Sequence, residues 1–151
     1  MAKKIANKEK KVAWDAFSRF IRVRDCLDTT GLAFVGRCIT CNRKFHIRAL
    51  QAGHCLPGRT NSKLFDERLV HAQCRYFNEY KHGEKTKYEA AMIKRYGQAE
   101  FEQMKTEARK IVPDNGMDFI ALKTLYENKY RELMKSRGFK TYGELLQQNN
   151  I

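Results

Sequence analysis

The sequence predicts an α+β fold, in which a small mixed unit at about residues 34–83 lies between helical segments. Apolar residues before and after this unit repeat with the period of an α-helix, whereas the unit itself holds short β-branched and apolar pieces. With 151 residues, the chain suits one core with helical extensions. We divide it into an N-terminal basic helix at 1–33, a core at 34–97 and a helical C-terminal extension at 98–151.

The helical segments are predicted from the spacing of their apolar residues. Trp14, Phe17 and Ile21 lie three and four residues apart and predict an amphipathic helix over residues 10–26. The C-terminal extension has a longer apolar stripe, which we assign to the core or to the seam with a partner helix: Phe119, Leu122, Tyr126, Tyr130 and Leu133. Two shorter helices are predicted at residues 98–112 and 142–148.

The middle of the chain is predicted to hold short strands, a loop and two further helices. The pieces "AFVGRCITC" and "KFHIRAL" predict a hairpin or knuckle that leads into a strand near Phe45–Gln51. The stretch "PGRTNS" is a loop by composition. One helix is expected from about Ala72 to Gly83 and another from about Lys85 to Tyr96.

The charge of the chain indicates a polyanionic partner. Thirty Lys and Arg against 17 Asp and Glu give a net charge of +13. Residues 1–24 carry eight basic and two acidic side chains, and residues 37–63 carry six basic and none acidic, so each segment has a net charge of +6. Residues 98–151 reach only +1, from nine and eight. This local excess favours nucleic acid as the partner over a basic protein without one.

Composition also indicates the compartment. No apolar run approaches the roughly 20 residues that span a bilayer, and no apolar segment follows the basic N-terminus as in a secretory signal. We therefore expect a cytoplasmic protein with reduced thiols and no membrane partner. In that compartment the five cysteines favour metal ligands or buried thiols over disulfides.

Three cysteines are candidate ligands of a structural zinc ion. Cys38 and Cys41 form a C-x-x-C turn, the zinc knuckle, whose two sulfurs can reach one tetrahedral ion at about 2.3 Å. Cys74 is the third candidate, and Phe77 stands where a fourth cysteine is expected. The alternative is that these cysteines pack in the core without a metal ion.

The fourth ligand of such an ion is left open by the sequence. His71 lies three residues before Cys74 and is the first candidate, followed by His46 and Cys55. Cys26 lies within the predicted N-terminal helix, where we expect an inert, buried thiol.

A second group of residues has the pattern of a one-metal phosphodiesterase. His54 follows a predicted strand, and Asn78 and His82 are four residues apart, so that a helix would present both on one face. A divalent ion held there would stabilise the charge of a phosphodiester transition state. An imidazole can be neutral near pH 7, so His54 could deprotonate the attacking water.

The order "CITC … GHCLP … ERLVHAQCRYFN" resembles the HNH, or ββα-metal, endonuclease superfamily. More specifically, "LQAGHCLPGR … FDERLVHAQCRYFNEYKHG" resembles the NinG (Rap) recombination proteins of lambdoid phages. The resemblance is strongest over residues 38–97. It implies that the 34–97 core is a small ββα-metal, HNH-like unit with a zinc knuckle, flanked by the N-terminal and C-terminal helices.

The resemblance also implies roles for individual residues. His54 would be the general base, Asn78 a ligand of a catalytic Mg²⁺ or Mn²⁺, and His82 a further ligand. The three cysteines would hold a structural Zn²⁺. The chain would then be a metal-dependent endonuclease, acting on branched recombination intermediates such as Holliday junctions and D-loops in the bacterial host cell. The alternative is a zinc-containing DNA-binding accessory protein without catalysis, and a homodimer is compatible with either.

Three positions depart from the HNH pattern. Gly53 stands where many members have an acidic residue or a histidine on the catalytic metal, with Asp66 as a candidate replacement. Leu69 stands where an asparagine commonly braces the loop that carries the catalytic histidine. Phe77 replaces the fourth zinc cysteine.

Basic residues flank the predicted site, and we expect them to contact DNA phosphates rather than bases. They are Arg37, Arg43, Lys44, Arg48, Arg59 and Lys63.

Overall fold

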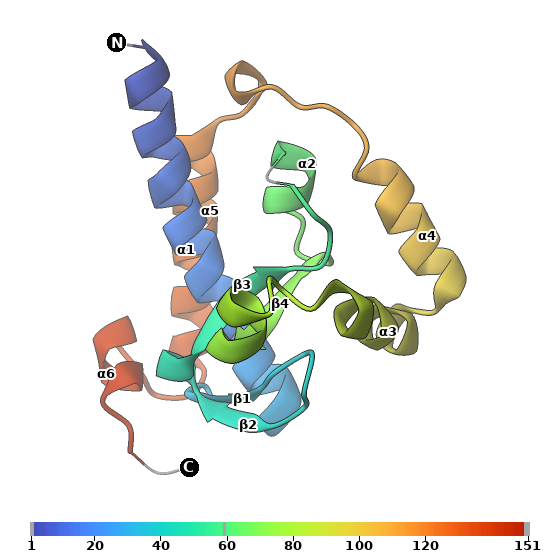
Figure 1. Ribbon diagram of the computed structural model, residues 1–151. Helices are drawn as coiled ribbons and strands as arrows, with labels where there is room; N and C mark the ends of the chain where they lie inside the picture. The colour runs from blue at the N-terminus through green and yellow to red at the C-terminus, as the bar shows by residue number, and fades with distance from the viewer. Residues whose placement is uncertain (1, 59, 150–151) are drawn as a thin grey trace.

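A computed structural model describes the chain over residues 2–58 and 60–149 (Figure 1). Six α-helices are present in these ranges: α1 (Ala2–Thr30), α2 (Asn61–Leu64), α3 (Lys85–Tyr96), α4 (Gln98–Glu107), α5 (Phe119–Lys135) and α6 (Tyr142–Leu146). The strands are β1 (Val35–Arg37), β2 (Lys44–His46), β3 (Leu50–His54) and β4 (Val70–Cys74). Short helical turns complete the order: η1 (Ile47–Ala49), η2 (Tyr76–Tyr80) and η3 (Asp114–Gly116). The fold is therefore mixed α+β.

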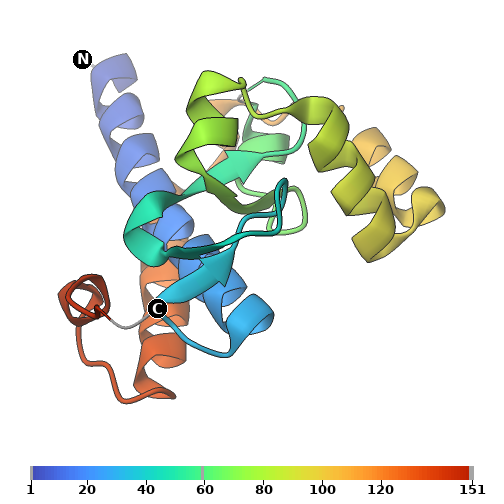
Figure 2. The same cartoon turned by 60° about the horizontal axis from the view of Figure 1, so that its bottom comes forward.

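The strands form two small antiparallel hairpins. In the first, β1 pairs with β2, and in the second, β3 pairs with β4 so that Leu50 lies opposite Cys74 and His54 opposite Val70. Two-stranded sheets are marginal in water on their own, so they depend on the helices that cover them. Figure 2 shows both hairpins against α1, with α3 and α4 on the far side.

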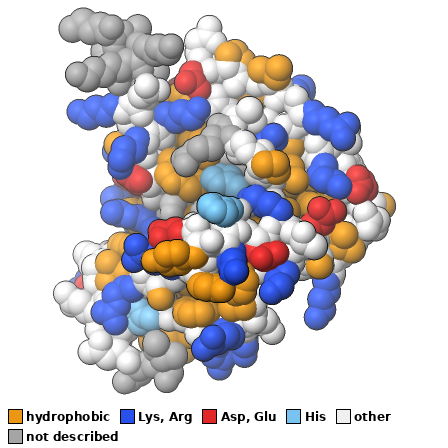
Figure 3. Space-filling view, in the orientation of Figure 1, with side chains coloured by type: hydrophobic (Ala, Val, Ile, Leu, Met, Phe, Trp, Pro, Cys, Tyr) orange, Lys and Arg blue, Asp and Glu red, His pale blue; other side chains and the backbone are white. Residues whose placement is uncertain are grey.

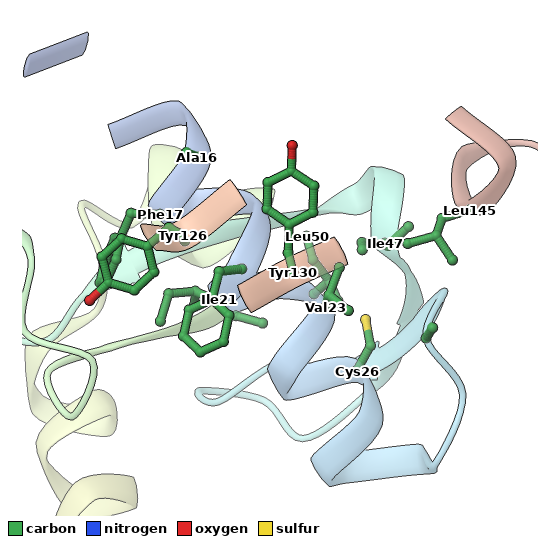
Figure 4. Packing of buried hydrophobic residues seen from close by; sticks show 14 of the residues in the cluster. Ala16, Phe17, Ile21, Val23, Cys26, Ile47, Leu50, Tyr126, Tyr130 and Leu145 are labelled. Atoms are coloured by element: carbon green, nitrogen blue, oxygen red, sulfur yellow. The ribbon is translucent and has the colours of Figure 1, made fainter. Parts of the chain in front are cut away.

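The main core joins α1 to α5 and to both hairpins. Phe17 and Ile21 of α1 are fully buried, and Tyr126 and Tyr130 of α5 are nearly so (Figure 4). The ring centroids of Phe17 and Tyr126 are 4.7 Å apart in an edge-to-face arrangement. The aromatic stripe of α5 is thus a packing surface inside this molecule, as the core assignment predicted. Cys26 is fully buried here, as expected, and burial raises the pKa of its thiol to about 12.

A second apolar cluster lies between α3, α4 and the loop before β4. Leu69, Tyr88, Met92 and Phe101 are all buried there. The Tyr88 hydroxyl donates a hydrogen bond of 2.7 Å to the carbonyl of Gly53, so this cluster also fixes the position of β3.

A buried ion pair fastens α1 to β4. The Asp25 carboxylate accepts hydrogen bonds from the Ala72 backbone N–H at 2.6 Å and from Arg24 Nε at 2.8 Å, and it lies 3.3 Å from His71 Nδ1. Burial alone would raise the pKa of Asp25, but its hydrogen bonds and opposite charges from His71 and Arg24 lower the pKa to about 2. The group therefore stays ionised in the folded protein.

We expect Asp25 to make stability depend on pH in acid. Its folded pKa of about 2 lies below the ordinary 3.8. Its contribution, about 2 kcal/mol, is therefore fully present above pH 3.8 and is lost as the pH falls through 2. In Asp25→Asn, the free energy of unfolding should change less with pH over this interval. Urea titrations at several pH values measure it. Asp28→Asn is the matched control, since the Asp28 side chain is 51% exposed. An unchanged pH profile in Asp25→Asn would contradict this linkage.

The structure corrects the predicted helix that begins at Ala72. Residues 70–74 form β4, and all five are buried. Val70, Ala72 and Cys74 alternate with His71 and Gln73, which is the period of a strand, but a helix that begins at Ala72 divides this segment. The helix that follows, η2, ends at Tyr80 rather than at Gly83, and the strand expected near Phe45–Gln51 is interrupted by η1.

No helix within the described part of the chain is both long and apolar enough to cross a bilayer.

Candidate metal centre and nucleic-acid site

Three cysteines from two segments of the chain meet beside the second hairpin. Cys38 and Cys41 come from the turn between β1 and β2, and Cys74 ends β4. Their sulfur atoms all lie within 4.8 Å of one another. Thiolates on one tetrahedral zinc are about 3.8 Å apart, as follows from Zn–S distances of about 2.3 Å. The cluster therefore fits a metal ion such as zinc after a small contraction.

Backbone N–H groups around Cys38 favour the thiolate form of its side chain. Burial alone would raise the pKa of this thiol, but hydrogen bonds from the backbone N–H groups of Cys74, Cys41 and Thr40 lower the pKa. The Cys74 N–H lies 3.3 Å from the Cys38 sulfur. A thiolate is the form that binds metal ions, so these donors favour the ligating state.

The structure does not bring the proposed fourth ligands to the cysteines. His71 contacts Asp25, the Arg68 carbonyl and, at 3.1 Å, the Tyr96 hydroxyl. His46 accepts a hydrogen bond from the Arg48 N–H and caps η1. Cys55 lies in the second apolar cluster, where burial raises the pKa of its thiol to about 12. Among the described His, Cys, Asp and Glu residues, only the three cysteines gather at this place.

His54 lies at the end of β3 in a separate pocket of about 540 Å³. Its imidazole is half-buried and stacks on the indole of Trp14, with ring centroids 4.9 Å apart. The Lys85 ammonium donates a hydrogen bond to the His54 carbonyl and fixes the strand end. The pocket lining comes from α1, β3 and η2: Trp14, Ser18, Arg22, Gln51, Ala52, His54, Asn78 and Glu79.

Asn78 reaches the same pocket from η2. Its Nδ2 donates a hydrogen bond of 2.8 Å to Gln51 Oε1. Gln51 Nε2 donates in turn to the Glu79 carboxylate at 2.6 Å, and Arg75 also binds this carboxylate at 2.7 Å. These two hydrogen bonds lower the pKa of Glu79. The pocket thus combines an imidazole, an amide oxygen and a carboxylate, which are oxygen and nitrogen donors suited to a divalent ion.

Gln51, Glu79, Trp14 and Arg22 are members of this pocket that the sequence reasoning missed. The available signal was the position of Glu79, directly after Asn78 on the predicted helix. The sequence assigns Trp14 and Arg22 only to an amphipathic helix, because no spacing rule links α1 to a strand that begins 20 residues after its end.

Two other candidates lie elsewhere. His82 is exposed in the turn after η2 with a positive φ of 49°, so Asn78 and His82 do not share the face of one regular helix. Asp66 binds Arg68 through both carboxylate oxygens and lines a different pocket, beside α2. Among the residues that line the His54 pocket, the one carboxylate is that of Glu79.

The departure at Gly53 has a packing reason. A Cβ here would overlap Gln73 Oε1 and lie 3.0 Å from Gln73 Cβ and 3.1 Å from Asn78 Oδ1. Gln73 cannot move aside easily, because its fully buried amide donates to Thr40 Oγ1 at 2.6 Å and to the Gly83 carbonyl at 2.8 Å. The absence of a side chain at residue 53 lets η2 approach β3 closely.

Gly53→Ala should therefore destabilise the protein by about 1–3 kcal/mol, the usual cost of overpacking. Urea denaturation measures the change in the free energy of unfolding. Gly143→Ala in α6 is the control, because its added Cβ meets only Thr141 Oγ1 at 3.8 Å and should be neutral or mildly stabilising. Equal stability of the Gly53→Ala variant and the wild type would mean that η2 is not packed as described.

Leu69 also has a clear structural role. Its side chain is buried in the second apolar cluster, and its carbonyl accepts a 3.0 Å hydrogen bond from the Cys55 N–H. The loop after His54 is thus held by backbone and apolar contacts at the position where an asparagine was expected.

The residues predicted to contact phosphates lie in the first hairpin, in η1 and in α2. Arg43, Lys44 and Arg48 are exposed, whereas Arg37 and Lys63 are half-buried. Arg48 donates a hydrogen bond to the Leu146 carbonyl, and Lys63 donates one to the Pro57 carbonyl. Arg59 lies outside the described residues.

Comparison with protein families gives one match, to the family described as the bacteriophage lambda NinG protein, over residues 1–136. No curated protein and no solved structure matches the chain.

Proposed function

The chain belongs to the family of the bacteriophage lambda NinG protein, and we propose that it is a metal-dependent DNA endonuclease of phage recombination. Its substrates would be branched intermediates such as Holliday junctions and D-loops. The matched residues include the N-terminal helix and both hairpins, and therefore every residue that lines the His54 pocket.

The observation that carries this proposal is the meeting of His54 and Asn78 in one pocket. The two residues come from β3 and η2, and β4, which pairs with β3, lies between them in the chain, so the order is strand, strand, helix. This is the order expected of a ββα-metal nuclease, with the histidine on the first strand and the asparagine on the helix. Arg22 adds a positive charge to the pocket wall, as a phosphodiester substrate requires.

Each residue has a defined task in the proposed hydrolysis. His54 accepts the proton of the attacking water, and the stacking of Trp14 keeps the imidazole in one orientation. Asn78 and Glu79 would hold a Mg²⁺ or Mn²⁺ ion, which stabilises negative charge on the scissile phosphate when bound. Gln51 orients both of these side chains through its amide. The three cysteines would hold a structural zinc ion apart from the reaction.

A second candidate function is DNA binding without catalysis. The observation that favours it is that the Glu79 carboxylate already accepts hydrogen bonds from Gln51 and Arg75, which compete with a metal ion for its oxygens. Incubation of supercoiled plasmid with Mg²⁺ or Mn²⁺ separates the two functions, since only the endonuclease converts it to nicked circles. Binding of a four-way junction without any cleavage under either ion would establish the second function.

DNA affinity should be dominated by phosphate contacts. For about five neutralised phosphates, the logarithm of the binding constant should fall with the logarithm of the salt concentration with a slope of about −4 to −5. Fluorescence anisotropy with labelled DNA at several salt concentrations measures this slope. A flat response, or strong preference for one base sequence, would indicate direct base readout instead.

A further inference from the structure

An apolar pocket of about 400 Å³ lies beside the cysteine cluster and takes no part in the proposed hydrolysis. Three aromatic rings contribute to its walls, from Phe45 of β2 and from Tyr76 and Phe77 of η2. Arg43, Arg75 and Ala49 also line it, together with Cys41 and Cys74 of the cysteine cluster. The volume lies within the range of about 300–1,000 Å³ that is typical of small-molecule sites.

The tyrosines of η2 are unusually exposed for large aromatic side chains. Tyr76 is 53% and Tyr80 69% exposed. The N–H of Lys81 bonds to the carbonyl of Tyr76, five residues earlier, so η2 is a π-helical turn, wider than a turn of an α-helix. Residues 76 and 80 therefore project to the same side, while Asn78 turns toward β3. The helix thus presents Asn78 to the His54 pocket and the tyrosine rings to solvent.

Positive charges accompany these rings. The Arg43 guanidinium lies 6.0 Å from the ring centroid of Phe45, and the Lys81 ammonium lies 5.7 Å from that of Tyr76. Arg75 is paired with Glu79. Figure 3 looks onto this face, where hydrophobic side chains gather over the hairpin of β1 and β2 and over η2, with Lys and Arg beside them. Aromatic rings beside cations suit a single nucleic-acid strand, whose bases stack while its phosphates pair with the cations.

We propose that this pocket receives an unpaired base of a DNA strand. Tyr76 and Phe45 stack on the base, and Arg43 and Lys81 contact the flanking phosphates. The inference deepens the proposed function and rests on it for the identity of the ligand as DNA. Because η2 carries both Tyr76 and Asn78, a strand held by its unpaired base lies next to the pocket that would cut it. A D-loop contains an unpaired strand and continuous duplex DNA has none, so this contact selects such intermediates over continuous duplex DNA.

Binding without Mg²⁺ or Mn²⁺ tests the proposal independently of cleavage. A single-stranded oligonucleotide and a blunt duplex of the same sequence are titrated with wild type, Tyr76→Ala and Tyr76→Phe. Tyr76→Ala should weaken single-strand binding by about 5- to 150-fold, the effect of losing one stacked base, and change duplex binding less than twofold. Tyr76→Phe should bind as wild type does. Ile120→Ala is the control, since Ile120 is 51% exposed on α5.

A measurement on the wild-type protein guards against misfolded variants. A 2-aminopurine base in the single strand should lose fluorescence severalfold on binding, because stacking quenches it. Wild-type affinity of Tyr76→Ala for the single strand, or equal losses on both DNAs, would overturn the proposal and leave the face to a protein partner. Quenching without any cleavage of a junction would retain this site and reject the nuclease. Cleavage of the junction without quenching would support the nuclease and reject this base-binding site.

Discussion

His54→Ala should lower the rate of junction cleavage by about 10²- to 10⁴-fold, the usual contribution of a positioned acid–base group. The expected loss arises because no other imidazole among the lining residues of this pocket can accept the proton of the attacking water. Single-turnover cleavage of a labelled four-way junction, under matched Mg²⁺ or Mn²⁺, measures the effect.

Two further variants separate a chemical role of His54 from a structural one. His54→Ala also removes the ring that stacks on Trp14, so its thermal stability must be compared with that of His54→Gln, which retains a polar side chain of similar length. Zinc content and DNA affinity should be unchanged in both. Asn78→Ala should lose cleavage because it binds the catalytic metal ion less tightly. A raised Mn²⁺ concentration should therefore restore part of the activity of Asn78→Ala and none of the activity of His54→Ala. If His54→Ala cuts at the wild-type rate, the pocket is not the active site.

Cys38→Ser should remove a bound zinc ion and destabilise the hairpins. Structural zinc contributes on the order of 10 kcal/mol to the folding of small zinc peptides. Here the ion would tie the turn between β1 and β2 to the end of β4, so its loss should lower the melting temperature by more than about 10 °C. Elemental analysis should find about one zinc per wild-type chain and none in the variant.

Cys55→Ala provides the matched control for this experiment. Cys55 is also a buried cysteine, but its thiol lies in the second apolar cluster rather than in the metal centre. This variant should keep its zinc and show only the modest instability of a small cavity. A wild-type protein that folds cooperatively without zinc would reject the structural ion altogether.

The sequence predicted the parts of the fold that depend on local periodicity. The stripe from Phe119 to Leu133 identified α5, and the spacing of Trp14, Phe17 and Ile21 identified α1, because an amphipathic helix repeats its apolar face regularly. The meeting of the three cysteines was also foreseen, since the C-x-x-C turn fixes two of them locally.

The errors have a common cause in β4. The expected helix from about Ala72 placed Cys74 in a helical turn, and His71 was a candidate ligand because it lies three residues before Cys74. In a strand, residues an odd number apart point to opposite faces, so His71 faces Asp25 while Cys74 faces the metal centre. The pairing of Asn78 with His82 rested on the same assumption of a continuous helix. Gln51 and Glu79 were missed because their contact joins segments that only the tertiary fold brings together.

The packing of α1 against α5 sets an order of events during synthesis. About 90 residues separate the end of α1 at Thr30 from the start of α5 at Phe119. A ribosome that adds about 5–20 residues per second needs several seconds to deliver the second helix after the first. During that interval Phe17 and Ile21 have no α5 to cover them, so the nascent chain is most exposed to chaperones and to aggregation. Slowed translation between these helices should therefore reduce the yield of soluble protein without altering the stability of the molecules that fold.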